Sequence, residues 1–161
     1  MPANSDQSIR EHVVSLLQGG NAHTTFEDAM AGLPANARGK KVRGLPYTAW
    51  MLLEHLRIAQ QDILEFSRNP KHESPAWPKG YWSKESAPPS DAAWNKSVKS
   101  FRADLKAMQQ VVSDPKTDLY VPIPWGQGQT ILREALLMAD HNAYHLGEMV
   151  VLRRLLGTWP K

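Results

Sequence analysis

The stretch MADHNAYHLGEM, residues 138–149, contains two histidines four positions apart inside an apolar repeat. Met138, His141, His145 and Met149 recur at steps of three and four residues, the spacing that places side chains on one face of an α-helix. Both imidazoles are therefore expected to face the interior of the protein.

Working outward from this stretch, the same periodicity predicts further helices and almost no strand pattern. Capping residues and Gly or Pro breakers set the expected ends. The predicted helical segments are residues 5–18, 24–32, 48–67, 90–113 and 130–156. Four long helices joined by long crossover loops predict an all-α fold, an antiparallel four-helix bundle.

Length and composition predict one domain, residues 1–161, because 161 residues with 42% hydrophobic content suffice for a single core. The chain has no cysteine, which excludes disulfides, thiolate nucleophiles and cysteine-based zinc sites. No run approaches the roughly 20 apolar residues of a membrane span, and the first 18 residues do not read as a signal peptide. We expect a cytoplasmic protein without a membrane partner.

The net charge of +3 is spread along the chain, with its densest cluster in a loop bounded by Gly and Pro. That cluster comprises Arg38, Lys40, Lys41 and Arg43. It is interpreted as a solvated basic loop, because no nucleic-acid recognition motif accompanies it. We therefore expect no nucleic-acid partner.

A third histidine, His55, lies on the apolar face of the predicted helix 48–67. His141 and His145 are one helical turn apart, about 6 Å, so both rings can reach one ion between them. Three neutral imidazoles would leave a divalent ion with its full charge and with open coordination positions. The alternative is that each histidine is a core residue hydrogen-bonded to a neighbour.

Three pieces of the sequence together resemble one family: WMLLEHLRI (50–58), GQGQTILREA (126–135) and DHNAYHLGE (140–148). They are similar to the DinB-like (DinB/YfiT-type) superfamily of metalloenzymes, which are four-helix bundles, and the resemblance covers nearly the whole chain. It implies a divalent metal ion, zinc or nickel, bound by His55, His141 and His145. Relatives include thiol-dependent transferases and isomerases, so it also implies a low-molecular-weight thiol or a water as the activated group.

Two carboxylates on the last helix are candidate catalytic helpers. Glu134 falls on the histidine face two turns before His141, and Glu148 lies beside His145. Either could orient a ligand ring or act as a base, and either could be an ordinary helix-end carboxylate. Asn142, on the other flank, could instead form an interhelical hydrogen bond.

Aromatic residues gather in the two long loops, as Trp77, Tyr81 and Trp82 in one and Tyr120 and Trp125 in the other. They could close over one end of the bundle as a lid, or simply anchor the loops to the core.

Two classes of function follow from a three-histidine site. The first is a metal-dependent enzyme, an S-transferase that uses a thiol or a hydrolase that uses water. The second is a non-catalytic stress-response protein that binds a metal or a small ligand. A fourth protein ligand would favour the second class, whereas an open coordination position beside a pocket would favour the first.

The last helix is also apolar on the face opposite its histidines. The residues of that face are Leu132, Leu136, Ala139, Ala143, Leu146, Gly147 and Val150. Either the loop 71–89 or the same helix of a second subunit must cover so long an apolar face. The resemblance, to a family whose members are often dimers, favours a homodimer in which small residues let the two helices approach closely.

Overall fold

The structure, a computed structural model, describes residues 3–160. Its elements are α1 (Ala3–Gln18), α2 (Phe26–Met30), η1 (Ala35–Ala37), α3 (Ala49–Arg68), η2 (Lys79–Tyr81), α4 (Asp91–Ser113) and α5 (Ile131–Leu155). Over the described residues the chain forms no β-strand, only an isolated bridge between Pro122 and Thr130. The prediction of an all-α fold is confirmed.

Side-chain caps explain why the three longest helices begin where they do. Thr48 accepts a hydrogen bond from the Met51 amide, and Ser90 and Thr130 cap α4 and α5 in the same way. Each cap satisfies an amide that has no partner within the first turn. The caps act locally, which is why the predicted helix starts fall within one or two residues of the observed ones.

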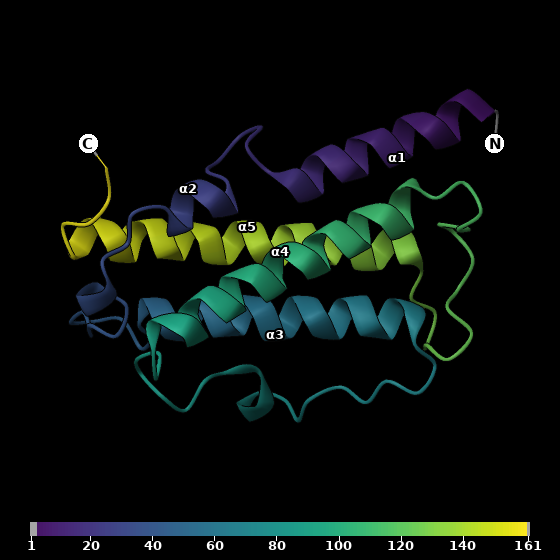
Figure 1. Ribbon diagram of the computed structural model, residues 1–161. Coiled ribbons are helices and arrows are strands. Elements are labelled where there is room, and N and C mark those ends of the chain that lie inside the picture. The colour runs from purple at the N-terminus through teal and green to yellow at the C-terminus, as the bar shows by residue number, and fades with distance from the viewer. Residues whose placement is uncertain (1–2, 161) are drawn as a thin grey trace.

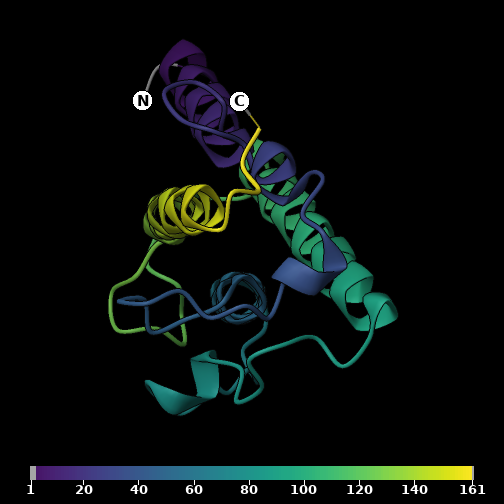
Figure 2. The ribbon, with the colours of Figure 1, turned by 90° about the vertical axis from the view of Figure 1, so that its left-hand side faces the viewer.

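Helix α3 packs against both α4 and α5, which lie on the same side of it in Figure 1. Helices α3 and α5 run antiparallel, as expected, whereas α3 and α4 run in the same direction. They do so because the connection 69–90 returns along the length of α3 before α4 begins. Helix α1 crosses over α4 and α5, as the end-on view shows (Figure 2).

Buried amides link the three central helices. Asn142 on α5 donates to Oε1 of Gln60 on α3 at 2.8 Å, and Gln60 donates to the backbone carbonyl of Phe101 on α4 at 2.6 Å. Gln60 is completely buried and Asn142 nearly so. These hydrogen bonds fix the relative positions of α3 and α5, the two helices that carry the histidines.

The outer face of α5 is covered only in part. Ala139 clusters with Val13 and Leu17 of α1, and Leu146 belongs to the cluster that contains Phe26 of α2. Thus α1 and α2, rather than the loop 71–89, cover one side of the predicted apolar face. Leu136 remains 42% exposed on the other side.

Among the helices of residues 3–160, none combines the length and the apolar character that crossing a membrane would require.

Candidate metal centre

Three histidines from two helices meet inside the bundle. Nε2 of His55 on α3 lies 3.0 Å from Nε2 of His145 and 3.1 Å from Nε2 of His141, both on α5. One ring nitrogen from each residue lies within 4.8 Å of the others. His55 is 4% and His145 9% exposed. The structure therefore brings together the three residues that the sequence predicted as ligands.

The outer nitrogens of two rings show which nitrogen carries the proton. Nδ1 of His55 lies 2.9 Å from the backbone oxygen of Tyr81, and Nδ1 of His145 lies 2.6 Å from Oε2 of Glu148. A carbonyl or carboxylate oxygen accepts hydrogen bonds, so each Nδ1 is the donor. In its neutral form each of these rings directs the lone pair of Nε2 at the centre of the cluster, where two facing lone pairs repel each other unless a cation lies between them.

Burial disfavours the protonated state of two of the three rings, those of His141 and His55. It lowers the pKa of His141 to about 4, with further lowering by the neighbouring His145 and His55. Burial also lowers the pKa of His55. Near neutral pH a shared proton is therefore a poor cation for this centre, and neutral imidazoles are the form that binds a metal ion.

An aromatic wall and a cavity adjoin the cluster. The Trp82 ring stacks on His55 with centroids 4.0 Å apart and planes at 3°. A cavity of about 440 Å³ lies beside His145, lined by Pro46, Tyr47, Met51, Trp82, Tyr144, His145 and Glu148. Burial, followed by the nearby Glu148, raises the pKa of Tyr47 to about 12, so its hydroxyl stays protonated.

The ring of His141 differs from the other two in its outer contacts. Its Nδ1 is buried and has no hydrogen-bond partner within residues 3–160, and the same is true of Oδ1 of the adjacent Asn142. The predicted interhelical role of Asn142 is seen in its contact with Gln60.

The two predicted helper carboxylates occupy different environments. Glu148 contacts His145 directly and lines the cavity. Glu134 is 2% exposed, accepts from the Arg133 side chain and is not among the residues whose ligand atoms cluster. A catalytic role for either residue stays a prediction.

The loop aromatics are divided between the two expected roles. Trp82 forms a wall of the site, whereas Trp125 anchors its loop through a hydrogen bond from its indole to the Phe66 carbonyl. Trp77 is 78% exposed.

Sequence reasoning missed two features near the centre. Tyr47 lines the cavity although it precedes α3 in a loop without a motif. The polar loop around His72 predicts an ordinary exposed residue, but His72 is partly buried and contacts Asp62 at 2.7 Å, so that prediction is wrong. Asp62 lies seven residues after His55, on the same helical face, a spacing that could have signalled its proximity to the site.

The family comparison agrees with this geometry. The sequence model of the DinB superfamily matches residues 20–149, a range that contains all three clustered histidines. No curated protein and no solved structure matches the chain.

Proposed function

The chain belongs to the DinB superfamily, and from this we propose that it binds one divalent metal ion, zinc or nickel, through Nε2 of His55, His141 and His145. The observation that carries the proposal is the convergence of three imidazole nitrogens. In two of the rings, Nδ1 donates to Tyr81 or Glu148, which leaves Nε2 unprotonated in the neutral ring. A buried acceptor cluster of this kind is stabilised by a cation, and imidazole is a common ligand of both metals.

We further propose that the site is catalytic, a thiol-dependent transferase or a hydrolase. A divalent ion on three neutral ligands keeps its charge and would lower the pKa of a bound thiol or water toward neutrality. The cavity beside His145 offers space for a small, largely apolar substrate. Glu148 orients His145, and the Tyr47 hydroxyl can donate a hydrogen bond into the same cavity.

The test of this function begins with protein purified without a histidine tag. Elemental analysis should find one zinc or nickel ion per chain, and the cobalt(II)-substituted form should show a visible spectrum that changes when a low-molecular-weight thiol is added. Turnover is then measured with thiols plus an electrophile, and with hydrolysable esters. A metal-loaded protein would instead be a non-catalytic binding protein if its spectrum did not change with thiols and it turned over neither the thiol and electrophile pairs nor the esters.

For assembly, we propose a homodimer formed by the part of α5 that α1 and α2 leave uncovered. Leu136 is 42% and Val151 49% exposed there, and between them a side chain added at Gly147 would meet no atom within 4 Å. The small residues Ala143 and Gly147 would let two such helices approach closely in a symmetric contact.

Light scattering tests the dimer. The protein should have the mass of two chains at micromolar concentration, and Ala143→Glu should halve that mass by placing a charge in the contact. A parent protein that is already monomeric would contradict the proposal.

A further inference from the structure

A loop segment reaches the metal centre from outside the bundle. Residues 71–82, here called the strap, run alongside α3 on the side away from α1 (Figure 1). The backbone oxygen of Tyr81 accepts from Nδ1 of His55 at 2.9 Å, and Trp82 stacks on the same ring. The strap therefore supplies both the outer hydrogen-bond acceptor and one wall of a proposed metal ligand.

One carboxylate on α3 holds both ends of the strap. Oδ1 of Asp62 lies 2.7 Å from Nε2 of His72, and Oδ2 accepts from the Tyr81 hydroxyl at 2.6 Å. The Asp62 and His72 side chains are only 14% and 18% exposed, so water competes little for these bonds. Asp62 lies seven residues beyond His55, about 10.5 Å along the helix, and does not itself reach the cluster.

Tyr81 connects this carboxylate to the metal centre, since its side chain binds Asp62 while its carbonyl binds His55. Burial, followed by the contact with Asp62, raises the pKa of Tyr81 to about 12, so the hydroxyl remains a donor near neutral pH. Hydrogen bonds to an ionised carboxylate are among the strongest in proteins.

The strap is folded tightly just before Tyr81, the residue whose side chain binds Asp62 and whose carbonyl binds His55. A Cβ added at Gly80 would lie 2.7 Å from Cβ of Pro75, so the chain closes on itself just before Tyr81. The short helix η2, which ends at Tyr81, leaves little freedom between the anchored side chain and the carbonyl. A fixed hydroxyl thus implies a fixed carbonyl.

We propose that Asp62 is a positioning residue of the metal centre. By anchoring His72 and Tyr81 it keeps the Tyr81 carbonyl on Nδ1 of His55, which fixes the tautomer that presents Nε2 to the ion. Outer hydrogen bonds of this kind set both the orientation and the basicity of a ligand histidine. The inference rests on the proposed metal function.

Substitutions of the anchors test the proposal, because no side-chain change can remove the Tyr81 carbonyl itself. Asp62→Ala deletes both anchors and, since Ala is a better helix former than Asp, does not weaken α3. It should reduce zinc affinity by about 10-fold in a competition titration with a chromophoric chelator. Tyr81→Phe should cause a smaller loss, and the double variant should be no worse than Asp62→Ala alone, since both changes break one connection.

The matched control is Glu65→Ala. Glu65 lies one turn further along α3, and its carboxylate binds Arg68 rather than the strap. Its zinc affinity should equal that of the parent protein.

A second measurement needs no metal. Nitrogen-15 NMR of the imidazoles should show His55 of the parent as a single Nδ1–H tautomer, and Asp62→Ala should show a mixture of tautomers. Failure of the parent to bind zinc would overturn the proposed function, while the tautomer comparison would still decide the role of Asp62. An unchanged tautomer of His55 in Asp62→Ala would overturn the inference. So would an Asp62→Ala variant that binds zinc as tightly as a zinc-binding parent, even if its melting temperature were lower.

Discussion

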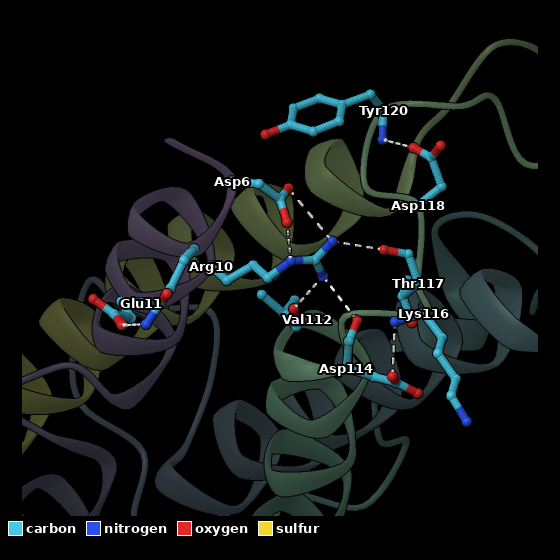
Figure 3. Close-up of polar contacts among 10 residues, drawn as sticks. Asp6, Arg10, Glu11, Val112, Asp114, Lys116, Thr117, Asp118 and Tyr120 are labelled. Atoms are coloured by element: carbon cyan, nitrogen blue, oxygen red, sulfur yellow. Dashed lines mark hydrogen bonds and ion pairs between the residues drawn. The ribbon is translucent and has the colours of Figure 1, made fainter. Parts of the chain in front are cut away.

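Two buried polar clusters in this molecule differ in how completely their hydrogen bonds are satisfied. At the end of α4, the Arg10 guanidinium donates to Asp6 at 2.7 Å and to the carbonyls of Val112, Asp114 and Thr117 at 2.8 to 2.9 Å (Figure 3). A longer contact of 3.4 Å to the second oxygen of Asp6 gives all five N–H groups an acceptor. This cluster is complete without any further ligand.

In the histidine cluster, by contrast, nitrogen acceptors face one another and one outer nitrogen has no partner within the described chain. Arg10 binds carbonyls in the last turn of α4 and in the chain that follows it, so its role is to hold α1 on that helix end. Two clusters of similar burial thus have different meanings, because a saturated cluster has a structural role, whereas converging imidazole nitrogens are able to hold a metal ion.

The sharpest test of this contrast is His141→Ala. It should weaken zinc binding by more than about 100-fold, since removal of a ligand exceeds the usual effect of losing an outer partner. Competition with a chelator gives the affinity. His12→Ala, at an exposed position of α1, is the control and should bind normally. Full metal occupancy of His141→Ala under mild chelation would show that the ligand set is wrong.

Arg10→Ala should give the opposite pattern. It leaves three carbonyls without a donor and should lower the free energy of unfolding by roughly 2–3 kcal/mol, as measured by urea titration. Zinc affinity should not change, because the guanidinium belongs to the saturated cluster. A parallel loss of zinc affinity would mean that the two clusters are energetically coupled.

The metal-free protein should lose stability on acidification because of His141. Its pKa falls from 6.5 to about 4 in the folded state, so the unfolded chain takes up a proton first as the pH drops. The contribution of His141 to the free energy of unfolding is therefore fully present above about pH 6.5. It declines as the pH falls towards 4 and does not change further below that pH. Urea midpoints at a series of pH values measure it, and His141→Gln should flatten the slope. An equal slope in that variant would assign the effect to other groups.

How much of this could be predicted from the sequence follows from the range of each interaction. The caps at Thr48 and Thr130 act within one turn, and the spacing of His141 and His145 is a property of the helix itself, so both were predictable. The position of His55 on an apolar face completed the cluster.

The outer contacts could not be predicted, because they depend on where loops dock. The acceptor of His55 is a backbone carbonyl 26 residues away, and the carbonyls that Arg10 binds lie more than 100 residues away. Every residue has a backbone carbonyl, so no pattern of residue types predicts which one will accept the hydrogen bond. The same holds for the covering of Ala139 by α1, which requires knowledge of helix packing.

The smallest expected effect concerns the unpartnered Nδ1 of His141. Once Nε2 binds a metal ion, the proton of the neutral ring must sit on Nδ1, which then becomes a donor. The adjacent Asn142 offers a buried acceptor, Oδ1, that also has no partner among residues 3–160.

The orientation of that acceptor is set by the amides of the core. Nδ2 of Asn142 donates to Gln60, and Gln60 donates to Phe101, so Oδ1 is the free end of a chain that spans three helices. We therefore expect Asn142→Ala to reduce zinc affinity by less than about 10-fold. Gln60→Met should reduce it less, because it keeps the Asn142 amide and only removes the hydrogen bond that orients it. Zinc titrations of both variants measure this, with unfolding curves to separate the effect from lost stability. Should Asn142→Ala bind zinc as tightly as the parent while unfolding more easily, the unsatisfied atoms at His141 would have no part in metal binding, and only the three converging Nε2 atoms would distinguish this cluster from that of Arg10.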